Sequence, residues 1–218
     1  MPRLLFEKNG NAVWISHLDL MRLFQRSFKR AGLALKHSQG YSPRPYVSVI
    51  LPLSVGVESV CELLDFDLDG ENVPNDQIKD RLNRVLTDGV RVLEVYDEGA
   101  KIKHLALLDC IVTMEYDQGV PDGASDAISK LFRRESLTVE KKGKNGPSQQ
   151  DIIPMIRRIA ITEGEKEICL RARVCCQNPA LNPMQLAAAV RDYLPELAPD
   201  HARSKRIEIY DTNENVFR

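Results

Sequence analysis

Residues 15–32 have the sequence ISHLDLMRLFQRSFKRAG, and this stretch decides the fold of the first half of the chain. Ser16 is a residue type whose hydroxyl accepts a hydrogen bond from the exposed N–H groups at a helix start. Asp19 adds a carboxylate at the third helical position, where it complements the helix dipole. Gly32 supplies a C-terminal stop. The sequence therefore predicts a helix over about 17–31.

This predicted helix is amphipathic. The residues with the spacing of one buried face are Leu20, Phe24, Phe28 and Ala31. A basic stripe occupies another face at positions i, i+4 and i+7, and its residues are Arg22, Arg26 and Lys29. A helix of this kind packs on a sheet through its apolar face and leaves its basic face to solvent or to a ligand.

The pattern on either side of the helix predicts an alternation of strands and helices. Residues 3–15 predict two short strands around Asn9-Gly10, because Asn-Gly between apolar runs is a strong hairpin signal. After the helix we expect, in chain order, two strands, a helix and a strand at 46–51, 60–68, 74–86 and 90–96. The outline is strand, helix, strand, strand, helix, strand, which fits a ferredoxin-like layer of helices on one antiparallel sheet.

A similar order follows a linker at residues 97–104. We expect a strand at 108–116, a helix at 124–134, strand candidates within 137–161, a strand at 168–175, a helix at 182–194 and a strand at 206–210. The sequence thus predicts an α+β protein of two ferredoxin-like units, with antiparallel sheets and helices packed on one face, over residues 1–98 and 105–218.

The composition is that of a globular protein, since 43% of the 218 residues are hydrophobic and 28% are charged. No apolar run approaches the roughly 20 residues needed to span a bilayer, and the N-terminal residues lack the apolar core of a signal peptide. We therefore expect a cytoplasmic protein without a membrane partner. The five cysteines are scattered and form no Cys-x-x-Cys pair, which predicts no disulfide framework, no metal site and no cofactor.

Charge is distributed unevenly, although the net charge is only −1. Residues 1–50 contain eight Lys and Arg against two acidic residues, a net charge of +6. Residues 51–100 contain four against twelve, a net charge of −8. This asymmetry indicates a surface in the first quarter that faces a polyanion, or alternatively two solvated faces that attract each other.

The candidate nucleic-acid-binding residues combine the basic side of the helix with the loop that follows it. They are Arg22, Arg26, Lys29, Arg30, Lys36, Arg44 and Tyr41. Tyr41 and Tyr46 flank Arg44, which suits base stacking beside charge. On a later strand, Arg171 and Arg173 share a face that would extend this surface. The alternative is a solvated helix face that binds nothing.

The Gly/Pro-rich loop at 35–45 is a second candidate site. Its motif residues are Ser38, Gln39, Gly40, Ser42 and Pro43. Loops on rigid scaffolds often carry function, and glycine permits the close approach of a ligand. The alternative is a tight connection in which the glycine and the prolines only set backbone angles.

His17 is the one weak candidate for a catalytic group. It lies in the first helical turn beside Ser16 and Asp19, and a histidine with a carboxylate neighbour can act as a general base. The competing interpretation is that Ser16 and Asp19 cap the helix while His17 packs locally. Because no further group completes a site, we expect no catalytic activity from the chain by itself.

Several motifs in the first sixty residues resemble those of a bacterial protein family. They are Arg3-x-x-Phe6-x-Lys8, ISHLDLMR (15–22), RAGL (30–33), SQGYSPxP (38–45) and LPLxVGVES (51–59). The motifs are similar to those of radical SAM-linked proteins of unknown function. That domain is fused to, or encoded beside, a radical S-adenosylmethionine enzyme, commonly near genes for a ribonuclease of the E/G type and a ribosomal protein. Weaker similarity continues at 151–154 and 182–183.

The resemblance implies a partner protein rather than a catalytic reaction of this chain. Radical SAM enzymes hold an iron–sulfur cluster with three closely spaced cysteines, and this chain has no such set, so the resemblance implies the accessory component. Three functions remain open. The first is an RNA-binding module that works with a separate radical SAM enzyme in the modification or processing of tRNA, rRNA or ribosomes. The others are a module that docks on that enzyme without RNA and a metal-independent RNA-processing enzyme that uses His17.

Overall fold

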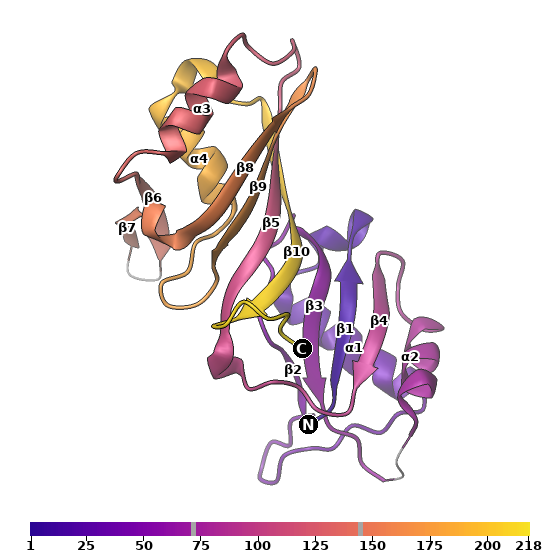
Figure 1. Ribbon diagram of the computed structural model, residues 1–218. Coiled ribbons are helices and arrows are strands. Elements are labelled where there is room, and N and C mark those ends of the chain that lie inside the picture. The colour runs from indigo at the N-terminus through magenta and orange to yellow at the C-terminus, as the bar shows by residue number, and fades with distance from the viewer. Residues whose placement is uncertain (71–72, 144–145) are drawn as a thin grey trace. The chain divides into compact units, whose positions relative to one another are not determined.

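The structure is a computed structural model of the chain, and it describes residues 1–70, 73–143 and 146–218. The chain divides into two compact units (Figure 1). Unit 1 comprises Met1–His104 with Val216–Arg218, and unit 2 comprises Leu105–Asn215. The expected combination of helices with sheets is confirmed. No helix in the described ranges is long and apolar enough to cross a membrane.

Unit 1 has a sheet whose central strands are the first and third in the chain. Its elements are β1 (Arg3–Lys8), η1 (Gly10–Trp14), α1 (His17–Arg30), β2 (Val47–Val49), β3 (Glu58–Phe66), α2 (Asn75–Asn83), β4 (Val90–Tyr96) and η2 (Ile102–His104). Neighbouring strands are antiparallel in the order β4-β1-β3-β2. Figure 1 shows α1 behind this sheet.

One hydrophobic cluster joins both helices of unit 1 to the same face of the sheet. α1 contributes Leu20, Phe24 and Phe28, and α2 contributes Ile78 and Leu82. Strand side chains alternate between the two faces of a sheet, so residues two apart on a strand reach the same cluster. The strand residues that do so include Leu4, Phe6, Leu64, Phe66, Val90 and Val92. The opposite side of α1 is left exposed, and that side carries the basic residues.

The hairpin predicted for residues 3–15 is wrong. β1 is followed not by a second strand but by the 3-10 helix η1, in which Gly10 has a φ of +52°. The buried Lys8 ammonium donates to the carbonyls of Val13 and Ile15, at 3.1 and 2.9 Å. The desolvation of Lys8 lowers its pKa. The Val13 carbonyl also accepts the Gly56 N–H at 2.9 Å, so neither carbonyl depends on a strand partner in a hairpin.

Val216–Arg218 belong to unit 1, although the second half was expected to extend to the last residue. Phe217 is buried, and the Arg3 guanidinium carbon lies 5.3 Å from the centroid of its ring. Arg3 also donates to the Asp65 carboxylate at 2.6 and 3.0 Å. The Arg side chain of the first strand therefore holds the end of the described chain through its ring contact.

Unit 2 has a similar order of elements with one insertion. Its elements are β5 (Leu105–Glu115), α3 (Ala124–Phe132), β6 (Thr138–Gly143), β7 (Gly146–Asp151), η3 (Ile153–Met155), β8 (Ile156–Glu163), β9 (Glu167–Cys175), α4 (Met184–Tyr193), η4 (Pro195–Leu197) and β10 (His201–Asp211). The main sheet is antiparallel in the order β10-β5-β9-β8, while β6 and β7 pair separately. Without β6 and β7, the strand order of both units is fourth, first, third, second.

Both helices of unit 2 lie on one side of its main sheet (Figure 1). Ile128 of α3 and Val190 of α4 are fully buried, as is Cys110 of β5. Burial raises the pKa of the Cys110 thiol to about 12, so this cysteine is a packed apolar group at neutral pH. Residues 144–145, within the predicted interruption of the strands after α3, lie outside the described residues.

Candidate nucleic-acid interface

The start of α1 is fixed by hydrogen bonds between neighbours in the sequence. The Ser16 hydroxyl accepts the Asp19 N–H at 3.2 Å and donates to the Asp19 carboxylate at 2.8 Å. The Ser16 bond lowers the pKa of Asp19, and Arg22, which donates to the same carboxylate at 2.9 Å, lowers it further. The helix therefore begins at His17, as predicted, and its first turn orients Arg22.

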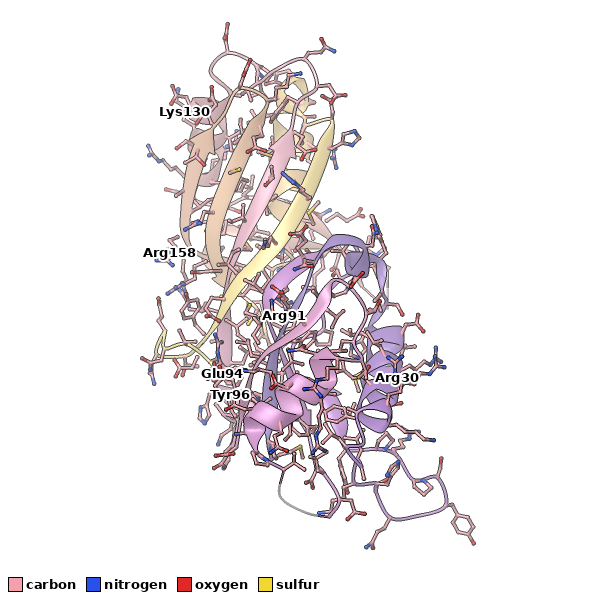
Figure 2. The ribbon with its side chains drawn as sticks, turned by 90° about the vertical axis from the view of Figure 1, so that its right-hand side faces the viewer. Arg30, Arg91, Glu94, Tyr96, Lys130 and Arg158 are labelled. Atoms are coloured by element: carbon pink, nitrogen blue, oxygen red, sulfur yellow. The ribbon has the colours of Figure 1, made fainter. Side chains whose placement is uncertain are left out.

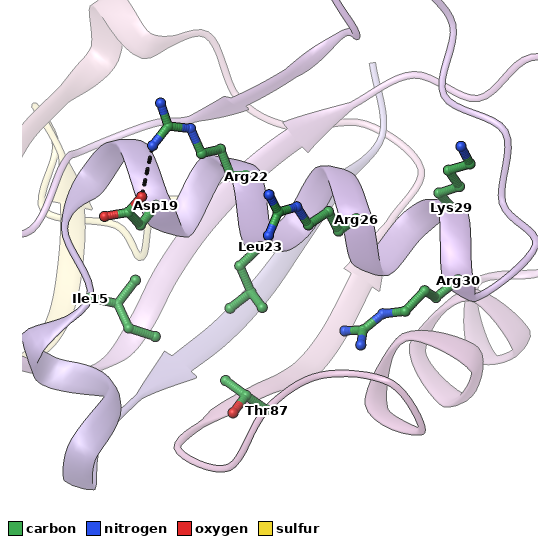
Figure 3. Close-up of a pocket in the computed structure, with 8 residues that line it drawn as sticks. All are labelled: Ile15, Asp19, Arg22, Leu23, Arg26, Lys29, Arg30 and Thr87. Atoms are coloured by element: carbon green, nitrogen blue, oxygen red, sulfur yellow. Dashed lines mark hydrogen bonds and ion pairs between the residues drawn. The ribbon is translucent and has the colours of Figure 1, made fainter.

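Four basic side chains of α1 line a groove with a largely apolar floor, here called the first groove (Figure 3). They are Arg22, Arg26, Lys29 and Arg30. The groove is also lined by Ile15, Leu23, Thr87 and the acidic Asp19. Arg26 follows Arg22 by four residues, and Lys29 and Arg30 follow Arg26 by three and four, which places them along one broad side of the helix. The structure thus brings together all four helix residues that the sequence predicted for nucleic-acid binding.

Two of these cations have partners within the protein. Arg22 pairs with Asp19, and Arg30 donates to the Val85 carbonyl at 2.6 Å. Arg26 and Lys29 are exposed, and their side chains make no hydrogen bond or ion pair with any residue that the structure describes. Arg26 still acts on the nearby Asp19 carboxylate, whose pKa it lowers. Both charges remain accessible to an anion, and Arg22 can change partner because an exposed ion pair contributes little.

The loop after α1 forms a narrow hairpin. His37 pairs with Pro45, the Ser38 N–H donates to the Arg44 carbonyl at 2.9 Å, and the Arg44 N–H donates to the Ser38 hydroxyl at 3.0 Å. Gly40 has a φ of +130°, a conformation that residues with a Cβ rarely adopt. Ser38 and Gly40 thus have a structural role, whereas the other motif residues are exposed, namely Gln39, Ser42 and Pro43.

The remaining predicted residues lie apart from the first groove. Lys36 pairs with Asp67 at 3.3 Å. Arg44 is exposed on the hairpin, and Tyr41 projects fully into solvent at its tip. None of these three lines the first groove. Their contribution to nucleic-acid binding stays a prediction.

His17 is partly exposed in the first turn of α1. Its Nδ1 atom is shielded from solvent and has no hydrogen-bond partner among the described residues. The nearby Asp19 carboxylate is instead held by Ser16 and Arg22. A general-base role for His17 stays a prediction. Within the ranges that the structure describes, no group of three His, Cys, Asp or Glu residues is placed to hold a metal ion.

Unit 2 contains an ion-pair network that the sequence analysis missed. The Asp109 carboxylate on β5 accepts hydrogen bonds from Arg173 at 2.7 and 3.1 Å, from Arg158 at 2.8 Å and from Tyr210 at 3.1 Å. The Arg173 guanidinium carbon also lies 3.7 Å from the centroid of the Tyr210 ring and pairs with Glu214 at 2.5 Å. Arg158 reaches the network from the surface of β8 (Figure 2).

The expectation that Arg173 extends a basic surface is therefore wrong. The hydrogen bond to Asp109 raises the pKa of Arg173, and the bond to Glu214 raises it further. Arg171, two residues earlier on β9, is exposed as expected. Alternation along a strand places Arg171 and Arg173 on one face but does not distinguish them, because only the partners of Arg173 on other strands bury it.

Three solved structures match this chain. A chain in the crystal structure of a Cbf5–Nop10–Gar1 complex matches with a TM-score of 0.52 at 10% identity, over 95% of this chain and 48% of that chain. A chain of the archaeal box H/ACA sRNP Nop10–Cbf5 complex matches with a TM-score of 0.45 at 12% identity, over 94% and 46%. An unknown protein from Galdieria sulphuraria matches at 0.26 and 9% identity, over 94% and 96%.

At 10% identity, the first of these similarities describes the fold alone. The chain spans about half the length of the first two solved chains that it matches. No curated protein matches it in sequence. A family model described as an uncharacterized protein conserved in bacteria (DUF2344) matches residues 2–183, and the chain therefore belongs to this bacterial family.

Proposed function

We propose that this protein is an RNA-binding module without catalytic activity of its own. The observation that carries the proposal is the first groove, where four cations of α1 outnumber the one carboxylate, Asp19, beside a largely apolar floor. Arg26 and Lys29 make no hydrogen bond or ion pair with any residue that the structure describes. Lys and Arg side chains bind phosphates independently of sequence. RNA recognition commonly combines such charge with surfaces that accept unstacked bases.

The proposed partner is a separate radical SAM enzyme, to which the module presents a tRNA, an rRNA or a ribosome-related RNA. Support comes from the resemblance of residues 15–22 and 38–45 to radical SAM-linked proteins. Residues 15–22 form the start of α1 and include Arg22 of the first groove. The motif at 15–22 and the proposed RNA surface therefore overlap.

We interpret both units as variants of the ferredoxin-like arrangement. Support comes from the two strand orders, β4-β1-β3-β2 and β10-β5-β9-β8, with two helices on each main sheet. Four-stranded sheets with helices on one face are a recurrent RNA-binding architecture. Because a fold does not imply a function, the proposal rests on the groove and not on this architecture.

Reversing two charges of the first groove should weaken RNA binding. We expect the Arg22→Glu/Arg26→Glu variant to bind total cellular RNA about thirtyfold more weakly than the wild type at low salt. The slope of log affinity against log salt should fall in magnitude by about 1.4, because each lost contact to single-stranded phosphate removes about 0.7. Filter binding of the purified protein across a salt series measures both quantities.

The matched control is Arg91→Glu/Lys101→Glu, which changes the net charge equally within unit 1. Arg91 lies on β4 between the core residues Val90 and Val92, and hence on the sheet face away from α1 (Figure 2). This variant should keep the wild-type affinity within about twofold. Equal losses in both variants, or no RNA binding by the wild type at low salt, would contradict the proposed function.

A docking module that binds no RNA is the second candidate, favoured by an exposed apolar group at the start of α1. Trp14, Leu18 and Val55 are 70%, 65% and 52% exposed. Such side chains are typical of protein contacts. If this candidate holds, association with the radical SAM enzyme is insensitive to salt, Leu18→Glu abolishes it in a pull-down assay, and the protein retains no RNA.

A further inference from the structure

A second groove lies on the other side of the basic stripe, between α1 and the hairpin at 35–45. Its floor consists of Leu33, Ala34, Leu35 and Pro45. Arg26 and Lys29 line both grooves, whereas Arg22 lines only the first. Arg26 and Lys29, whose side chains make no hydrogen bond or ion pair with the described residues, therefore have an apolar surface on each side.

Two polar side chains of the second groove have hydrogen-bonding groups to spare. His37 Nδ1 lies 2.8 Å from the Leu35 carbonyl oxygen, and because a carbonyl only accepts, Nδ1 carries the hydrogen of this bond. In the neutral ring Nε2 is then an acceptor whose direction is fixed by the Nδ1 bond. The Gln25 amide, with two donor hydrogens and an acceptor, has no hydrogen-bond partner in the described ranges.

We propose that the second groove binds one unpaired nucleotide of an RNA chain, an inference that rests on the proposed RNA-binding function. Arg26 and Lys29 bind the phosphate, and the base lies on the apolar floor with its edge toward the Gln25 amide. The His37 Nε2 atom accepts the hydrogen of the ribose 2′-OH. That hydroxyl is the group by which proteins distinguish RNA from DNA.

The composition of the groove favours a nucleotide over other anions. No carboxylate is among the described residues that line it, and Asp19, whose pKa Arg26 lowers, lines only the first groove. A small inorganic anion would leave the apolar floor unused, whereas a nucleotide joins a charged phosphate to a flat apolar ring. The donors and acceptors of Gln25 suit a base edge.

Filling the groove tests the place of the base. Ala34 is exposed, so Ala34→Leu extends into the groove without entering the core. We expect about tenfold weaker binding of a short single-stranded RNA, because one stacked base contributes on the order of tenfold, and unchanged binding of inorganic polyphosphate. Ala100→Leu adds the same side chain at an exposed position outside the groove and should change neither affinity.

Removing the acceptor of His37 tests the 2′-OH contact. In His37→Asn the amide nitrogen replaces Nδ1 and keeps the donor to the Leu35 carbonyl, while Nε2 is lost. We expect the wild type to bind RNA about fivefold more tightly than DNA of the same sequence, and the variant to bind both equally. Fluorescence anisotropy with labelled oligonucleotides measures the ratio, and an unchanged ratio overturns the assignment of His37.

Arg22→Glu separates failure of this proposal from failure of the proposed function. If Arg22→Glu weakens RNA binding and Ala34→Leu does not, the nucleotide site is overturned and RNA binding by α1 stands. If the wild type binds no RNA, both fail. Adenosine and uridine monophosphates distinguish the source of the nucleotide. If either binds as tightly as the oligonucleotide and is lost in Ala34→Leu, the ligand is a free nucleotide and the RNA assignment is overturned.

Discussion

Asp109→Ala lowers the free energy of unfolding of unit 2 by about 3–5 kcal/mol, the usual cost of removing one partner of a buried ion pair. The carboxylate accepts both hydrogen bonds that Arg173 directs to β5, at 2.7 and 3.1 Å. The Arg173 side chain is only 9% exposed, so water cannot replace the lost oxygens. Glu214 remains as a partner for one guanidinium nitrogen and keeps the loss from being larger.

The same carboxylate makes the stability of unit 2 depend on pH. Burial raises the pKa of Asp109, but the hydrogen bonds from Arg173, Tyr210 and Arg158 together outweigh burial and hold the pKa below its ordinary value. A group whose pKa is lower in the folded state contributes stability above its unfolded pKa of about 4 and loses it as the pH falls through the folded pKa. The difference between the wild type and Asp109→Ala should therefore shrink below about pH 4.

Glu115→Ala is the control on the same strand. Glu115 pairs with Arg203 at 3.1 Å, but the two side chains are 39% and 58% exposed, so the loss should be under about 1 kcal/mol. Urea unfolding followed by circular dichroism gives the free energies, and hydrogen exchange of β9 amides assigns the loss to unit 2. Equal costs for the two variants would show that Asp109 contributes no more than a surface charge.

The helix with the proposed RNA surface was predictable because its signals are local. Ser16 and Asp19 form the hydrogen bonds expected from their types and spacing, and Leu20, Phe24 and Phe28 are buried at the expected period. Each of these signals acts within four residues along the chain. The basic stripe follows from the same period, so its assembly into one groove wall required no tertiary information.

The segment after β1 was not predictable, because distant residues decide it. The Asn9 N–H donates to the Gly89 carbonyl at 2.8 Å, and Lys8 turns inward to the carbonyls that follow. An Asn-Gly pair in a hairpin and the one at residues 9–10 look alike until these partners are known. The Asn-Gly pair does form a turn, but the tertiary hydrogen bonds favour a 3-10 helix over a hairpin turn.

The polar contacts of both candidate grooves and of the Asp109 network show the same limit. Arg173 and Asp109 are on adjacent strands but 64 positions apart, so strand alternation alone could not pair them. The second groove could not be predicted either, because the orientation of His37 depends on a hairpin that Ser38 and Arg44 close. The residue types showed which side chains are charged. Which charges form ion pairs, and which acceptors stay without a donor, depended on the folded backbone.

Phe24→Ala should cost unit 1 about 3–5 kcal/mol, because it removes a ring from the centre of the core between α1 and the sheet. Phe24 is fully buried, and its ring centroid lies 4.8 Å from that of Phe6 in an edge arrangement. The loss weakens the attachment of α1 to β1 without touching a charge. Urea unfolding, with hydrogen exchange of α1 amides, measures the loss and assigns it to unit 1.

Leu18→Ala, on the same helix, is the control for this substitution. Leu18 is 65% exposed, and its truncation should change the free energy of unfolding by no more than about 0.5 kcal/mol. RNA affinity adds a second readout, because the basic side chains lie opposite the buried face. Below the unfolding transition, Phe24→Ala should bind RNA as the wild type does, whereas Arg22→Glu/Arg26→Glu should lose binding at unchanged stability. If Phe24→Ala loses RNA binding while α1 still protects its amides, the ligand contacts more of this helix than its charged side.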